Sequence, residues 1–316
     1  RLDEANLMAE MAKSFEEVEI LREPNVPTVP LKPDFTRNMT AALLLGVCFS
    51  IFSVYVRATM ERTLQWSFQL AGVVERETDL ARAGSRIFSL PALPSPRAFG
   101  SMLEKSNFVV PEPYKRSIIH LENLAKSEQV RKIGVMPVTP FAEAHMTTVI
   151  LGLYLTELSN KMVLIDTDYS RYSVSDLVAS LGLPLSSGIE QGPGLSEYLE
   201  GQVEDFVDVI YPLGKTVYGS FIPNGHPQEA GFQFSHKNLT QLEANLSPNY
   251  NFVLYGLTPI EHSYDSIAVG RTLDGVLLVV HPGRTTTDQV HHAVKELKNA
   301  GCRLLGILFQ PEQMPG

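Results

Sequence analysis

The sequence predicts an α/β fold: a mostly parallel, doubly wound sheet over residues 131–316, preceded by one transmembrane helix and a short helical arm. From Lys132 onward, continuous apolar runs such as KIGVMPV, KMVLIDTD and DGVLLVVHP alternate with amphipathic stretches. Strands that are apolar throughout are typical of a parallel sheet covered on both faces. An uncharged stretch from Met39 to Val56 predicts the transmembrane helix, because it is long enough to cross most of a hydrocarbon core.

The composition fits this architecture and excludes other classes of protein. The chain has 316 residues, of which 44% are apolar and 19% charged, so it can bury a core. Its net charge of −9 gives no basic field, and nucleic acid is therefore not an expected partner. Two cysteines, Cys48 and Cys302, cannot build a disulfide framework, and no H-x-x-x-H pair occurs. We therefore expect no structural metal.

Residues 1–36 are predicted to be the end of a helix followed by an extended connector. Apolar side chains recur at helical spacing through residues 1–23. Four prolines between Pro24 and Pro33 then stop the helix, because each one removes a backbone donor. The chain starts at Arg1 with charged residues, so we expect no signal peptide and a longer natural protein.

Residues 37–57 are predicted to cross the membrane. The uncharged stretch lies between Arg37 and Arg57 and extends for about 27 Å as a helix, against a hydrocarbon core of roughly 30 Å. The alternative is a buried core helix, but no neighbouring segment supplies its apolar partners. Acidic residues dominate before the span and arginines follow it, which predicts a periplasmic arm and a cytoplasmic C-terminal part.

Residues 58–130 are predicted to be a cytoplasmic juxtamembrane linker that retains some helix. One helix extends to about Gln69, a proline-containing connector follows, and a second helix begins at Glu112 and ends near Ser127. Beyond residue 130, further strands are expected in the runs VYGSFIP, NFVLYGLT and CRLLGILFQ, and a helix is expected over residues 142–159.

The first loop that follows a strand of the sheet, residues 138–148, is the first place to look for a nucleotide site, because ligands bind beyond the carboxyl ends of parallel strands. A phosphate-binding P-loop needs glycines, a lysine and a Ser or Thr. This loop has no glycine before Met146, which stands where the lysine is expected, and Glu143 adds negative charge. Only Thr147 and Thr148 remain of the motif, so no nucleotide cofactor is predicted.

Four later motifs extend over the rest of the domain. They are VLIDTD at residues 163–168, GLSEYLEG at 194–201, FIPNG at 221–225 and DGVLLVVHPGRTTT at 274–287. With the proline-rich arm, the single span and the helix that opens at Glu112, they resemble the C-terminal part of a polysaccharide co-polymerase, or chain-length determinant, of the bacterial tyrosine-kinase type.

This resemblance implies a fold of the P-loop NTPase type for residues 131–316 and a location in the bacterial inner membrane. It implies an earlier span and a periplasmic domain upstream. The expected partners are other copies of the chain, in a homo-oligomer, and other membrane subunits of polysaccharide synthesis or export.

Departures from the family pattern predict a degenerate domain without catalysis. In the family, Asp166 and Asp168 would orient Mg²⁺, but Gly256 replaces a further strand-end aspartate. A C-terminal tyrosine cluster is absent from residues 309–316, and Ile118 replaces an arginine of the ring-assembly motif. We define the vestigial pocket as the six residues that would have formed the nucleotide site: Met146, Thr147, Thr148, Asp166, Asp168 and Gly256.

Structural roles are the favoured interpretation of the individual polar residues. Asp166 and Asp168 would cap the following turn, and Thr147 and Thr148 would satisfy amides at a helix start. Solvent-exposed positions are expected for His145, His291 and His292. A helix N-cap is expected at Arg284 and Thr285–Thr287. Structural contacts, rather than phosphorylation, are expected for Tyr169, Tyr172 and Tyr198.

The sequence therefore predicts a polysaccharide co-polymerase that controls exopolysaccharide chain length or export and carries a silent cytoplasmic scaffold. Two enzyme readings stay open: an ATPase or protein tyrosine kinase with an unorthodox nucleotide loop, and a ParA-like ATPase fused to an anchor. The sequence names neither the sugar nor the partner proteins nor the number of subunits.

The charge asymmetry around the span gives a topology prediction. In a variant without Cys48 and Cys302, a cysteine at Ile20 should react with a membrane-impermeant thiol reagent applied to the periplasm, and one at His120 should not. The reverse labelling pattern would refute the predicted orientation.

Overall fold

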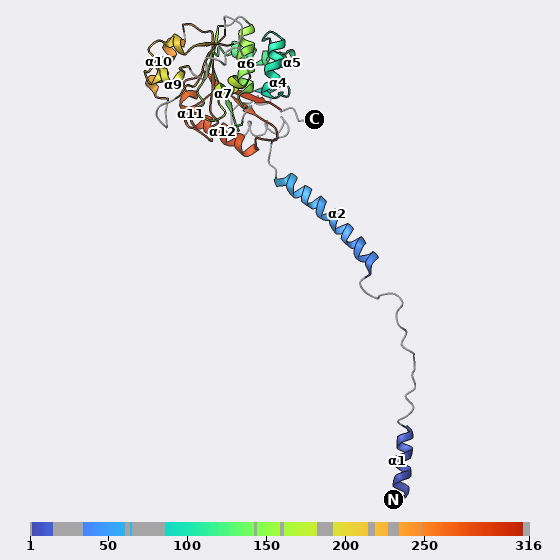
Figure 1. The fold of residues 1–316 in the computed structure, drawn as a ribbon. Helices are drawn as coiled ribbons and strands as arrows, with labels where there is room; N and C mark the ends of the chain where they lie inside the picture. The colour runs from blue at the N-terminus through green and yellow to red at the C-terminus, as the bar shows by residue number, and fades with distance from the viewer. Residues whose placement is uncertain are drawn as a thin grey trace. The chain divides into compact units, whose positions relative to one another are not determined.

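The computed structural model describes residues 2–14, 34–60, 64, 86–141, 144–158, 161–181, 192–213, 219–226, 234–246 and 248–311. The fold is drawn in Figure 1. The chain divides into two compact units, residues 1–61 and residues 62–316. The proline-rich connector and the helix expected to extend to Gln69 lie outside the described residues, apart from Leu64 and the residues up to Met60.

The first unit contains two helices, α1 (Leu2–Ser14) and α2 (Phe35–Met60). Within α2, residues Phe35–Arg57 are long and apolar enough to cross a membrane, and none of that window is buried within the protein. This agrees with the span predicted over residues 37–57. An apolar helix without protein cover matches a lipid environment, since water would be a poor solvent for it.

The second unit is built on an eight-stranded sheet in the order β1-β8-β7-β2-β6-β3-β5-β4. All neighbouring strands are parallel except β4, which pairs antiparallel with β5. The strands are β1 (Ile87–Ser89), β2 (Lys132–Pro137), β3 (Met162–Asp166), β4 (Tyr211–Pro212), β5 (Gly219–Ile222), β6 (Phe252–Gly256), β7 (Gly275–Val280) and β8 (Leu304–Phe309). The predicted mostly parallel sheet is confirmed.

Helices cover both faces of this sheet, as predicted for a doubly wound fold (Figure 1). Successive residues of β3 show why: Leu164 belongs to one buried apolar cluster, whereas Val163 and Ile165 belong to the other. The first cluster is covered by α4 (Pro96–Lys105), α5 (Glu112–Ser127), α6 (Met146–Glu157) and α7 (Val174–Ser180). The second is covered by α9 (Leu195–Leu199), α10 (His236–Leu246), α11 (Asp265–Gly270) and α12 (Thr287–Asn299), with the short 3-10 turn η2 (Phe206–Val209).

The linker predicted over residues 58–130 differs from the structure in its second half. The helix expected from Glu112 is confirmed as α5, but the proline-containing connector holds β1, which pairs with β8, and α4, whose Phe99 and Leu103 are fully buried. Residues 86–130 therefore belong to the sheet unit. A three-residue strand is too short to leave an apolar pattern in the sequence, which explains the difference.

Leu64 is bonded to the loop after β7, at the carboxyl edge of the sheet. Its side chain is fully buried in the second apolar cluster. Its backbone N–H donates to the Thr285 carbonyl at 2.9 Å, and the Gly283 N–H donates to the Leu64 carbonyl at 2.8 Å. These two bonds fix the loop after β7 to residue 64.

Candidate functional site

The vestigial pocket lies at the carboxyl edge of the sheet, where β2, β3 and β6 end. Asp166 closes β3 and is paired in register with Gly256, the last residue of β6. Met146 begins α6, the helix that follows β2. The three segments that carry the six residues therefore meet at the place where α/β sheets bind ligands.

The start of α6 differs from the predicted threonine cap. His145 occupies the N-cap position, and no side-chain bond caps the helix there. Thr147 and Thr148 lie inside the first turn, beyond the position from which a hydroxyl can cap, so that prediction is wrong. The Thr147 hydroxyl instead donates to Gln310 Oε1 at 3.0 Å. Met146 is fully buried in the first apolar cluster, so the side chain at the expected lysine position is part of the core.

Asp166 holds the turn after β3, as predicted. Its Oδ1 accepts the Asp168 N–H at 3.0 Å, and its Oδ2 accepts the Ser175 N–H at 2.7 Å and the Ser175 hydroxyl at 2.6 Å. Complete burial and then the neighbouring charge of Asp168 raise the pKa of Asp166 to about 6. This carboxyl group joins β3 to the first turn of α7.

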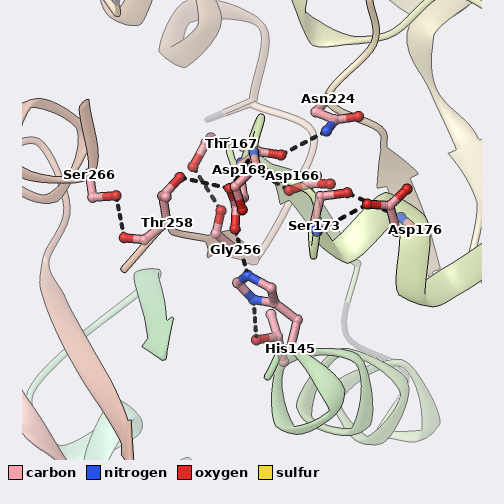
Figure 2. Close-up of polar contacts among 12 residues, drawn as sticks. His145, Asp166, Thr167, Asp168, Ser173, Asp176, Asn224, Gly256, Thr258 and Ser266 are labelled. Carbon is pink, nitrogen blue, oxygen red and sulfur yellow. Dashed lines mark hydrogen bonds and ion pairs between the residues drawn. The ribbon is translucent and has the colours of Figure 1, made fainter. Parts of the chain in front are cut away.

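Asp168 forms an ion-pair-type contact that the sequence did not indicate. Its Oδ2 lies 3.1 Å from His145 Nε2, and its Oδ1 accepts the Thr258 hydroxyl at 3.0 Å and the Ser170 N–H at 2.8 Å (Figure 2). The side chains of Asp168 and His145 are both 1% exposed. Burial would raise the pKa of Asp168, but the hydrogen bonds from His145 and Ser170 outweigh it and hold the pKa below its usual value.

The expected solvent position of His145 is therefore wrong. The ring turns inward from the start of α6 toward the end of β3 (Figure 2). A lone histidine in a loop carries no signal of this in the sequence, because its partner lies 23 residues away. By contrast, His292 on α12 is exposed, as predicted, and His291 is half-buried.

Gly256 leaves no room for the aspartate that the family pattern has there. A Cβ atom at this position would lie 2.3 Å from Val174 Cγ2, in the first turn of α7. Val174 is itself fully buried. Any larger side chain at position 256 would therefore have to displace the Val174 side chain.

A second cluster lies beside the pocket, in the loops after β2 and β7. His281 is fully buried, and neither ring nitrogen has a hydrogen-bond partner in the part of the chain that the structure describes. It meets the Phe141 ring edge-on at 4.4 Å, and the Arg284 guanidinium lies 4.6 Å from the same ring. Burial and then the charge of Arg284 lower the pKa of His281 to about 3. The sequence offered no sign of this buried imidazole.

The threonine run after β7 divides its roles. Thr286 caps α12 through a reciprocal capping box with Gln289, which confirms the predicted N-cap. Thr285 is fully buried, and its hydroxyl meets that of Thr139 at 2.9 Å, which joins the loop after β7 to the loop after β2.

The three tyrosines differ in exposure. Tyr198 is buried, and its hydroxyl accepts bonds from Gln241 and Asn245, so its structural role is confirmed. Tyr169 is half-buried and packs against the second apolar cluster, also in line with a structural role. Tyr172 is 39% exposed.

A nucleotide with Mg²⁺ does not fit these residues. The Asp168 carboxylate is already bonded to His145, Thr258 and Ser170, and the Met146 side chain supplies no charge. A carboxylate side chain at position 256 would collide with Val174. Within the described ranges, no group of three or more His, Cys, Asp or Glu residues has the arrangement to hold a metal ion.

Comparison with known proteins finds similarity to bacterial tyrosine kinases, although no family model matches the chain. The chain is 21% identical to the tyrosine-protein kinase etk of Escherichia coli K12 over 300 residues, 89% of this chain and 39% of that protein. It is 22% identical to the tyrosine-protein kinase YwqD of Bacillus subtilis over 225 residues, 68% of this chain and 90% of that protein. Its relatives are bacterial tyrosine kinases. The chain spans about two fifths of the length of the E. coli relative.

Solved structures show the same fold. The chimerical protein CapA2B2 matches with a TM-score of 0.58 and 17% identity, over 75% of this chain and 97% of that one. The BceF tyrosine kinase domain matches at 0.54 and 22%, over 71% and 92% of the two chains. The kinase domain of E. coli ETK matches at 0.54 and 18%, over 81% and 91%. The predicted fold class is confirmed.

The buried neutral His281 gives a prediction for the pH dependence of stability. The pKa of His281 is about 3 in the folded state and near 6.5 in the unfolded state. The free energy of unfolding is therefore independent of this group above pH 6.5 and decreases as the pH falls from 6.5 toward 3. Between pH 6.5 and 5 this loss should reach about 2 kcal/mol. The free energy of unfolding of the full chain in detergent should not show this acid-dependent decrease in His281→Phe. Above pH 7.5, the difference in free energy of unfolding between this variant and wild type should be constant. Parallel pH profiles for the two proteins would contradict the assignment.

Proposed function

We propose that this chain is the membrane-anchored C-terminal part of a polysaccharide co-polymerase that controls exopolysaccharide chain length or export. The relatives named as bacterial tyrosine kinases, the motifs shared with co-polymerases of that type and the membrane-length helix α2 support the class. The N-terminal arm is periplasmic, and the sheet unit is cytoplasmic.

We further propose that the sheet unit is a catalytically silent scaffold. The observation that carries this step is that the vestigial pocket is occupied by its own side chains. Asp168 is bonded to His145, Met146 is part of the apolar core, and Val174 of α7 fills the space that a side chain at position 256 would need. Phosphoryl transfer requires positioned phosphates and a metal ion that neutralises charge, and these residues supply neither.

A scaffold must fold into a well-packed structure, and the burial of the strands in the sheet unit supports such a fold. Every residue of β3, β6, β7 and β8 is buried, and α12 keeps its apolar stripe against the sheet. Loss of catalysis with retention of a packed fold favours a binding role. The partners in this proposal are other copies of the chain and other subunits of the polysaccharide machinery in the inner membrane.

An active ATPase or tyrosine kinase is the second candidate, because the relatives carry the name of tyrosine kinase. Such an enzyme would have to bind the phosphates without the glycines and lysine of a P-loop. The two candidates differ in nucleotide affinity and in their dependence on the carboxylates of Asp166 and Asp168.

Nucleotide binding separates the candidates directly. Titration of the full chain in detergent with ATP or ADP in magnesium buffer should give no binding heat up to millimolar concentration, since the loop after β2 lacks its phosphate ligands. Saturable micromolar binding that disappears in Asp166→Ala would overturn the silent-scaffold proposal.

The scaffold role predicts a separation of phenotypes in cells. Deletion of residues 64–316, which removes the whole sheet unit and keeps the span, should change polymer length or export. The pair Asp166→Asn and Asp168→Asn, which keeps the size of both side chains and removes their charge, should change the polymer far less than the deletion does, because a scaffold requires the folded sheet unit and no catalytic charge. Protein level and protease resistance serve as controls for folding. Loss of polymer in a charge-neutral variant that folds and accumulates would favour the enzyme instead.

A further inference from the structure

The pair formed by His145 and Asp168 is a deeply buried ion-pair-type contact at the carboxyl edge, with both side chains 1% exposed. An ionised carboxylate in a protein interior is costly unless partners replace the water that it loses. Asp168 is 1% exposed, yet its pKa is held below the usual value. The protein therefore stabilises the charged form of this group from within.

The geometry defines how the imidazole does so. Nε2 faces the carboxylate at 3.1 Å and must donate its proton, since an ionised carboxylate only accepts. Nδ1 lies 3.5 Å from the Thr148 hydroxyl, one turn along the same helix. The contacts of the ring thus favour the tautomer with hydrogen on Nε2.

The same carboxylate connects several elements of the edge. The Thr258 hydroxyl, after β6, donates to its second oxygen, and the Ser266 hydroxyl of α11 donates to the Thr258 carbonyl (Figure 2). On the other side, the Asn224 side-chain amide donates to the Asp168 carbonyl at 2.7 Å. The position of Asp168 therefore sets the position of the loops after β5 and β6.

The imidazole of His145 lies at the carboxyl edge of the sheet, where a ligand of this fold would be expected. It extends from the N-terminal end of α6, and helix N-termini beside parallel strands are places where anionic ligands bind. A metal-bound nucleotide would have to displace protein partners there, because the Asp168 carboxylate is already bonded to His145, Thr258 and Ser170.

We propose that His145 is an internal ligand. Its imidazole takes the place of an external cation beside Asp168 and holds the carboxyl edge in one conformation that needs no nucleotide. The inference rests on the proposed scaffold function and deepens it: the edge loops are presented to partners at all times, instead of being ordered by a bound molecule.

Replacement of the internal ligand by a free one tests this directly. In His145→Ala, the melting temperature of the full chain in detergent should fall by about 10 °C, because Asp168 loses its buried partner. Millimolar imidazole should restore much of this loss in a saturable manner. It should have no such effect on wild type or on the matched control His292→Ala, which changes an exposed histidine of α12.

The proposal requires that the added imidazole binds to the Asp168 carboxylate. In the background Asp168→Asn, the further change His145→Ala should therefore cost far less, and imidazole should not rescue it. Equal losses in both backgrounds, or no saturable rescue in His145→Ala, would overturn the proposal.

A measurement on the wild-type chain guards against a variant that does not fold. With ¹⁵N-labelled histidine, the buried imidazole that disappears from the spectrum of His145→Gln should carry its proton on Nε2. A proton on Nδ1 alone would overturn the proposal. The two proposals can fail separately. Micromolar ATP binding by the wild type would refute the silent scaffold, whereas the imidazole rescue of His145→Ala decides whether His145 is an internal ligand.

Discussion

Burial of the central strands on both faces is the constraint on which the rest of the structure depends. When every residue of a strand is covered, polar side chains have no place along it and gather where the strands end. Asp166, Asp168 and Thr258 all lie at such ends. Because the apolar layers exclude water there too, a buried titratable group must either find partners within the protein or lose its charge, and the hydrogen-bond network of the edge follows from that requirement.

This requirement gives the edge two different solutions. Around Asp168 the charge is retained and fully bonded. Around His281 the charge is absent: burial and the charge of Arg284 keep the ring neutral beside Phe141, and its nitrogens remain without partners in the described part of the chain. The first arrangement links β3 to the loops around it, whereas the second gives the imidazole ring no such link among the described residues.

Most of the fold follows from the order of apolar runs, since strands and amphipathic helices of ordinary length leave clear periodicities. β1 and β4 escaped prediction because two or three residues cannot show a period. The site was predictable in part. The missing glycines and lysine could be read from the loop, and so could the role of Asp166 in the turn after β3. The inward turn of His145 was not predictable, because its partner Asp168 lies 23 positions away and no local pattern reveals it.

The close approach of Val174 to Gly256 limits which residues position 256 can accept. A single change to aspartate there would place a Cβ atom 2.3 Å from a fully buried side chain, so the protein would lose stability. Val174 would have to become smaller first, at the cost of a cavity beside α7. Any route to an aspartate at position 256 therefore passes through a less stable intermediate, in either order of substitution. Packing around a single glycine can in this way hold a sequence at its present residue.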